Sequence, residues 1–149
     1  MKRFVFRLET VLEMRVRAEQ RAQAALGLAQ KQVTDAERYR ISLETRRMDA
    51  LIASATATFD QRVAAVQWAE SLSEKIRHVG FHLQTLEMEA EARRRELAKA
   101  ASDRRAVEKL RERARAEYEA EAQRVEQNQL DEVGSARYEF ARRQGAQAG

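Results

Sequence analysis

Residues 68–100 read WAESLSEKIRHVGFHLQTLEMEAEARRRELAKA. They lie in a stretch from Asp60 to Arg143 that contains no proline and only two glycines. Apolar residues recur there at alternating spacings of three and four, which keeps them on one side of a helix with about 3.6 residues per turn. This stripe consists of Leu72, Ile76, Val79, Leu83, Leu86, Ala90, Leu97, Ala100, Val107, Ala114, Tyr118 and Val125. At about 1.5 Å per residue the helix would be roughly 120 Å long, so it cannot bury the stripe against itself and needs a partner.

A second stripe of the same period precedes it, beginning at Leu8 and continuing through Leu43. Small and hydroxylated residues from Ala53 to Thr58 interrupt this pattern, because they continue a helix poorly. Thr58 and Gln61 fit a capping box, which would start the next helix. The sequence therefore predicts an all-α fold, a long antiparallel two-helix coiled-coil hairpin whose second helix is longer. The expected single domain, 1–149, comprises a helix over about 8–52, a bend over about 53–59, a helix over about 60–143 and a frayed tail over 144–149.

Three finer expectations concern the ends of this hairpin. Phe4 and Phe6 alternate as in an extended lead, and Thr10 with Glu13 fits another capping box, so the first helix would start after Leu8. Near the bend, apolar pairs should face each other across the seam, with Val63, Val66, Leu72 and Ile76 against Leu51, Met48 and Leu43. The first helix is short, so the seam should end near residues 101–107 and leave the rest of the second helix as an unpaired, amphipathic overhang.

Composition limits the function. Charged residues make up 35% of the chain, and the net charge is +4 with a pI of about 9.7. A basic balance allows nucleic acid or an anionic membrane surface as partner, but arginines alternate with glutamates as on a solvated helix face, so nucleic-acid binding is not the favoured interpretation. The chain has no cysteine. No apolar run approaches the roughly twenty residues of a membrane span, which indicates a soluble, cytoplasmic protein.

Few residues suggest chemistry. His78 and His82 are four residues apart and share a helix face, but no glutamate follows the first histidine as in a helical zinc site, and the chain has no third histidine. No glycine-rich phosphate loop is present, and a two-helix seam offers little burial to raise the pKa of a carboxyl group. We therefore expect no enzyme activity, no metal and no cofactor. Trp68 has two interpretations, as a core residue that plugs the hairpin near the bend or as a partner-binding hot spot.

The N-terminal pattern resembles a known family. Phe4 and Phe6 followed by Leu8, Val11, Leu12 and Arg15 look like the opening of the flagellar FliJ family. The length, the two-helix plan and the Leu130-Asp131-Glu132 sequence near the end also resemble that family, over essentially the whole chain.

The resemblance implies a non-enzymatic stalk or adaptor of the flagellar type III protein export apparatus, similar in fold to the stalk subunit of rotary ATPases. Its implied partners are the export ATPase hexamer, whose ring it would enter, the cytoplasmic part of the membrane export gate, and export chaperones, with no small-molecule substrate. The implied location is the cytoplasm, with peripheral association with the inner membrane at the flagellar base. By position, the gate-contacting residues of the family correspond to Trp68, Leu72, Lys75 and Val79 on the second helix and to Tyr39, Leu43 and Arg46 on the first. Lys75 and Arg46 depart from the small or aromatic residues expected there.

Two other functions remain as alternatives. A generic structural coiled coil, acting as a scaffold or tether, would use the overhang for self-assembly, although Arg104, Arg111 and Glu121 interrupt its stripe. A basic helical arm gripping nucleic acid would need one face dominated by Lys and Arg, and glutamates occur throughout.

Overall fold

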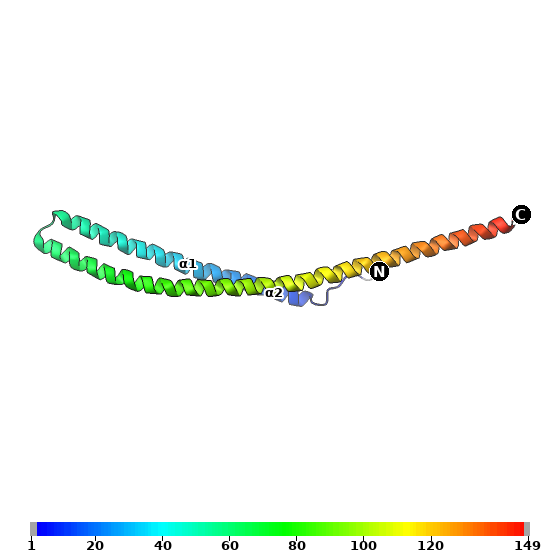
Figure 1. Cartoon of the computed structure of the whole chain (residues 1–149), viewed down its shortest axis with the longest axis horizontal. Helices are drawn as coiled ribbons and strands as arrows, with labels where there is room; N and C mark the ends of the chain where they lie inside the picture. Colours follow the sequence, from blue (N-terminus) through cyan, green and yellow to red (C-terminus); the bar gives the residue numbers. More distant parts are fainter. Residues whose placement is uncertain (1–2, 148–149) are drawn as a thin grey trace. The chain divides into compact units, whose positions relative to one another are not determined.

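A computed structural model shows two α-helices joined by a short bend, and it describes residues 3–147. Helix α1 spans Glu9–Ala53, the 3-10 turn η1 spans Ser54–Thr56, and helix α2 spans Phe59–Gln147 (Figure 1). With 89 residues, α2 is much longer than α1 with its 45. The predicted all-α helical hairpin with a longer second helix is confirmed.

The contacts divide the chain into two compact units, where we expected a single domain. The first, which we call the hairpin unit, is Arg15–Ser102 and contains the bend. The second, the end unit, contains the residues up to Met14 together with those from Asp103 onward. Each unit combines an early part of the chain with a part of α2, so each buries its own share of the stripe.

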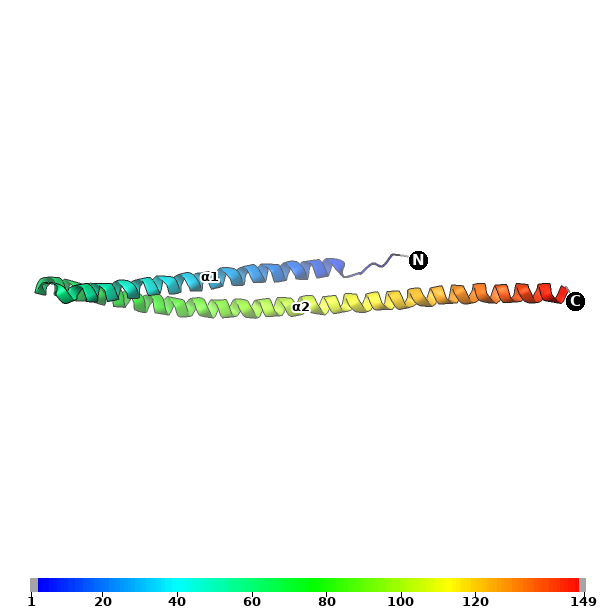
Figure 2. The ribbon, with the colours of Figure 1, turned by 90° about the horizontal axis from the view of Figure 1, so that it is seen from above.

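Within the hairpin unit the two helices run antiparallel. Near the bend, Arg47 of α1 donates a hydrogen bond from Nη1 to Ser73 Oγ of α2 at 3.3 Å. Farther from the bend, Ala36 of α1 lines the same groove as Val79 and His82 of α2. Contacting residues of α1 and α2 therefore lie at similar distances from the bend, as expected for antiparallel helices. The side-by-side ribbons in Figures 1 and 2 show the same arrangement.

The bend is held by hydrogen bonds from both sides. Thr58 Oγ1 accepts from the Gln61 amide at 3.4 Å while Gln61 Oε1 accepts from the Thr58 amide at 3.1 Å, which is the predicted capping box. Arg62 donates from Nε to the Ala57 carbonyl and from Nη2 to the Ala55 carbonyl. These bonds satisfy backbone groups that a helix terminus leaves without partners, so the reversal has a defined geometry.

The seam between the helices is thin. Among the residues that the structure describes, the buried apolar ones in the seam are Leu12, Ala29, Leu43, Ala69, Leu72, Leu83 and Ala90. Every position of the predicted α2 stripe, from Leu72 to Val125, is buried or half-buried. Because three of the seven buried residues are alanines, the helices can lie close together but bury little area per residue.

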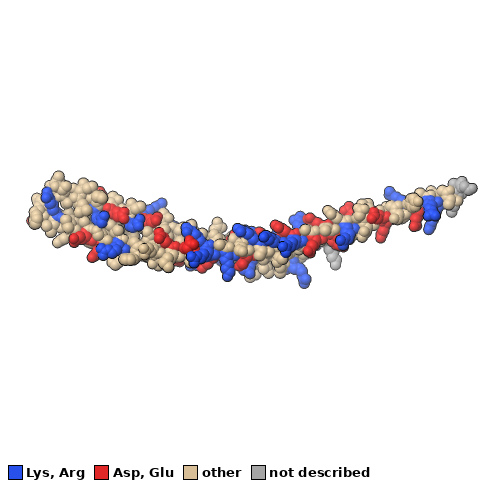
Figure 3. Space-filling view, viewed as in Figure 1, with Lys and Arg blue, Asp and Glu red and all other residues tan. Residues whose placement is uncertain are grey.

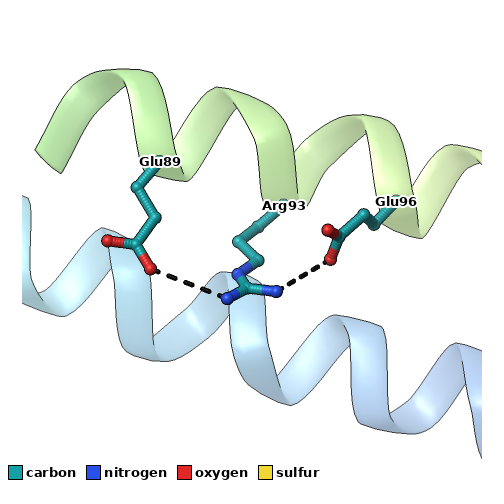
Figure 4. A network of polar contacts seen from close by, with 3 residues as sticks. All are labelled: Glu89, Arg93 and Glu96. Carbon is teal, nitrogen blue, oxygen red and sulfur yellow. Dashed lines mark hydrogen bonds and ion pairs between the residues drawn. The ribbon is translucent and has the colours of Figure 1, made fainter. Parts of the chain in front are cut away.

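An arginine occupies the α2 stripe seven residues after Leu86. The Arg93 guanidinium lies 3.6 Å from Glu89 and 3.0 Å from Glu96, both on α2 (Figure 4). The hydrogen bond to Glu96 and the charges of the two glutamates raise the pKa of Arg93 above its ordinary value. The helix that carries this charge therefore also neutralises it, which lets the stripe continue on either side.

Near the bend, the expected apolar pairs across the seam are wrong in part, because Leu43, Leu72 and Ile76 are buried or half-buried but the other residues are not. Met48, Leu51, Val63 and Val66 are exposed. Continued from Leu43 at spacings of four and three, the α1 stripe reaches Arg47 and Ala50 instead, and these are half-buried. On α2, Ala65 and Ala69 provide the facing side, so small residues close this end of the seam and the larger ones lie outside it.

In the end unit, the residues before α1 cover part of α2. Phe4 and Phe6 are half-buried whereas Val5 between them is exposed, which is the alternation of an extended strand. The Phe4 and Tyr118 rings lie 5.5 Å apart, and Arg111 Nε lies 3.4 Å from Glu9 Oε2. The expected end of the seam near residues 101–107 is therefore wrong. An extended segment spans about 3.3 Å per residue, roughly twice the rise of a helix, so a few residues cover several more turns of α2.

The ends of the helices also differ from expectation. The Leu12 amide donates to the Leu8 carbonyl at 2.9 Å, so α1 has already begun at Glu9 and Thr10 lies inside its first turn rather than capping it. At the other end α2 continues through residues 144–147, which we had assigned to a frayed tail. No proline stops the helix there, and a glycine at position 145 costs only about 1 kcal/mol. Residues 148–149 of that tail lie outside the described residues.

Candidate partner-binding surface

The residues predicted to contact a partner divide into buried and accessible ones. Leu43 and Leu72 are each only 1% exposed and are the most deeply buried large side chains of the seam. The resemblance implied that Leu72 contacts the export gate, which requires an accessible side chain. Its seven-residue spacing to Val79 and Leu86 instead puts it on the side of α2 that meets α1. Both leucines hold the two helices together beneath any surface that a partner could reach.

Trp68 lies outside the seam. Its side chain is 49% exposed, and the ammonium group of Lys75 sits 5.8 Å from its ring centroid. A cation over an indole face is attracted by the negative face of the ring, so the two residues hold each other in place. Trp68 therefore is not a buried plug. It presents a large, ordered, half-accessible aromatic surface with a positive charge above it.

Tyr39 and Val79 meet in a groove between the two helices. The groove has a volume of about 440 Å³ and is lined by Gln32, Asp35, Ala36, Tyr39, Val79, His82 and Leu86. Trp68, Lys75 and His82 recur every seven residues and so form one row along α2, while Gln32, Tyr39 and Arg46 form a row along α1. We call these two rows, together with Val79, the flank. Its members come from both helices, and only the hairpin brings them together.

Sequence reasoning missed several exposed apolar residues near the bend. The exposed apolar residues in this region, including some already named above, are Ile41, Met48, Leu51, Ile52, Phe59, Val63 and Val66. The signal was available, because the ten residues from Ala50 to Phe59 carry no charge in a chain that is 35% charged. In Figure 3 the bend end of the hairpin unit is correspondingly almost free of acidic and basic side chains.

His82 lines the groove and His78 is exposed, but neither belongs to a group of three or more possible metal ligands within residues 3–147. A second groove between the helices, of about 670 Å³, is bordered by Glu87, Glu91 and Arg94. Glu91 and Arg94 form an ion pair at 3.1 Å across one turn of α2. Both grooves are open surface features of a two-helix layer. A search of the described helices found none long and apolar enough to cross a membrane.

Fold and surface together define an antiparallel two-helix coiled-coil protein with an accessible aromatic and basic flank near its bend. The model of the flagellar FliJ protein family matches residues 4–145, and the chain belongs to that family. Membership of this family identifies the chain as a structural component related to flagellar protein export, as the resemblance of its N-terminal pattern implied. No curated protein and no solved structure gave a significant match.

Proposed function

We propose that this protein is the non-enzymatic stalk and adaptor of the flagellar type III protein export apparatus. In this role the end unit enters the ring of the export ATPase, and the flank of the hairpin unit contacts the cytoplasmic part of the membrane export gate. The single observation that carries the gate contact is the half-exposed Trp68 beneath Lys75, in the same heptad row of α2 as His82, which lines the groove with Tyr39 and Val79.

The contact surface proposed here is narrower than the residue set implied by the family resemblance. Trp68, Lys75, Tyr39 and Val79 contact the gate directly, because their side chains are at least partly accessible. Leu43 and Leu72 support that surface from within the seam, and a change at either alters binding through the helix packing. Tryptophan anchors that become buried on binding commonly contribute about 2 kcal/mol or more.

The gate contact is tested with Trp68→Ala and the purified cytoplasmic domain of the export gate. We expect the variant to keep its helix content and to bind at least about thirtyfold more weakly, since about 2 kcal/mol corresponds to that ratio. Phe81→Ala is the matched control, because Phe81 is an exposed aromatic residue of the same helix on the side away from α1. Circular dichroism and calorimetric titration on the same samples measure folding and binding. A folded Trp68→Ala protein with wild-type affinity would refute the gate contact at this residue.

The ATPase contact is supported by arginines at the two ends of the end unit rather than by the net charge of that unit. Arg3 and Arg7 lie in the lead before α1, and Arg142 and Arg143 lie near the end of α2. Several other arginines of this unit pair with glutamates of their own helix, for example Arg115 with Glu119 at 2.9 Å. We expect the double change Arg142→Glu and Arg143→Glu to weaken co-sedimentation with the assembled ATPase hexamer while gate binding is unchanged. Loss of both contacts, or of neither, would argue against this division of roles.

The nucleic-acid alternative has less support. In the face shown in Figure 3, basic side chains gather near the middle of the view, but acidic ones lie beside them and among the basic ones elsewhere, so the basic surface offered there is short and interrupted. The ion pairs of α2 also bring a carboxylate next to many arginines. Phosphate contacts would have to compete with these carboxylates, which reduces the gain in affinity from each arginine.

A further inference from the structure

The last part of α2 has an apolar face that differs from the seam. Leu130, Val133 and Phe140 are 61%, 51% and 63% exposed. They recur with Arg137 at spacings of three and four, so they share one side of the helix. Tyr118 and Val125 belong to one seam row with a spacing of seven residues, and the next position of that row is Glu132. The apolar residues from Leu130 to Phe140 therefore lie on a side of the helix that is rotated by roughly a third of a turn from the seam. We call Leu130, Val133, Arg137 and Phe140 the C-terminal face.

Charges are divided along this part of the helix. Residues 126–134 contain three acidic side chains and no basic one, namely Glu126, Asp131 and Glu132. Residues 135–143 contain the basic side chains Arg137, Arg142 and Arg143 and one acidic side chain, Glu139. An acidic half is therefore followed by a basic half, with Gly134 between them. Such a segment is complementary to itself when two copies lie antiparallel, because each acidic half then meets a basic half.

We propose that the C-terminal face binds the same face of a second copy of this chain, with the two helices antiparallel. Two-fold symmetry then places Leu130 against the second copy's Phe140 and Val133 against the second copy's Arg137. Glu126, which is in the heptad row of Val133 and Phe140, comes near the second copy's Arg143. Every contact occurs twice, so the pair buries both apolar clusters and forms two interhelical ion pairs.

The flanking residues permit this approach. Gly134, Ala136 and Ala141 lie beside the C-terminal face and are small. A Cβ added at Gly134 would meet no atom within 4 Å, so the space beside it is open. In a parallel pair, by contrast, Glu126 would meet Glu126 and Arg143 would meet Arg143, which like-charge repulsion disfavours. The antiparallel arrangement is the one for which both the apolar residues and the charges find partners.

The first test measures the mass of the full chain by sedimentation velocity at low salt, over concentrations up to about 200 μM. We expect a monomer–dimer equilibrium, and we expect Phe140→Glu to raise the dissociation constant at least about tenfold, because it places a negative charge against Leu130 in the acidic half of the second copy. Tyr138→Ser is the matched control, since Tyr138 is exposed on the same segment but points away from the C-terminal face. A protein that stays monomeric over this range overturns the proposal. A dimer that Phe140→Glu leaves intact overturns the assignment to this face.

The second test addresses orientation by exchanging charges. Glu126→Arg alone and Arg143→Glu alone should each weaken self-association several-fold, because each creates two like-charge contacts in its own homodimer. When the two variants are mixed, the heterodimer regains both opposite-charge pairs, and its affinity should return to within about twofold of the wild-type value. A mixture that associates no better than the separate variants overturns the antiparallel arrangement. These substitutions touch no residue of the flank, so gate binding by the same proteins reports independently on the proposed gate contact. Binding to the ATPase does not, because Arg143 also belongs to the proposed ATPase contact.

Discussion

Replacing Leu43 by Ala removes one of the two most buried large side chains of the hairpin unit. The change deletes three carbon atoms, and at about 0.8 kcal/mol per buried methylene the lost burial amounts to about 2.4 kcal/mol. The cavity left behind adds to this cost, while a two-helix layer can partly collapse around it. We therefore expect the free energy of unfolding to fall by about 2–4 kcal/mol. For a protein of this length the melting temperature should fall by roughly 5–12 °C.

Thermal and urea unfolding, followed by circular dichroism at the helix minimum, measure this loss. Ile41→Ala is the matched control, because it removes an aliphatic side chain of the same size two residues away that is 56% exposed. Alanine also has the higher helix propensity, so this control should change the free energy of unfolding by less than about 0.5 kcal/mol. If Leu43→Ala were no more destabilising than Ile41→Ala, the seam would not be the source of stability that its burial indicates.

Three further changes test other parts of the structure. Arg40→Leu should raise the free energy of unfolding by about 1 kcal/mol, because Arg40 lies in the seam row and its buried Nε makes no hydrogen bond, only a half-exposed ion pair with Glu44 at 3.8 Å. Arg38→Leu on the exposed side should give no such gain in melting temperature. Thr58→Ala should cost about 1 kcal/mol through loss of the capping box, and unchanged urea unfolding would show that the cap does not stabilise the bend. Phe4→Ala removes the ring contact with Tyr118, which is worth about 1 kcal/mol beyond its burial. Amide hydrogen exchange in α2 around Tyr118 should therefore become faster. Unaltered exchange there would contradict the packing of the lead on α2.

The helices and the reversal could be predicted because both depend on local chemistry. The three-and-four spacing from Leu72 to Val125 is a property of the chain alone, and any helix built from it carries that stripe on one side. The cap at Thr58 likewise involves only residues up to Gln61. For the candidate surface, Trp68, Lys75, Tyr39 and Val79 were identified in advance from the family resemblance, and the structure places them at accessible or half-accessible positions.

Burial at the level of single side chains required the partner helix. Whether Leu72 faces a partner protein or α1 depends on which side of α2 the first helix occupies. The stripe near the bend likewise does not reveal that Arg47 and Ala50, instead of Met48 and Leu51, take the seam positions. The reach of the lead was also hidden, because a few extended residues cover more of α2 than the same number in a helix, and the sequence does not state that Phe4 packs on Tyr118. Periodicity determines which residues share a side of one helix, whereas the packing of two helices decides which of those sides is closed to solvent and which remains open to a partner.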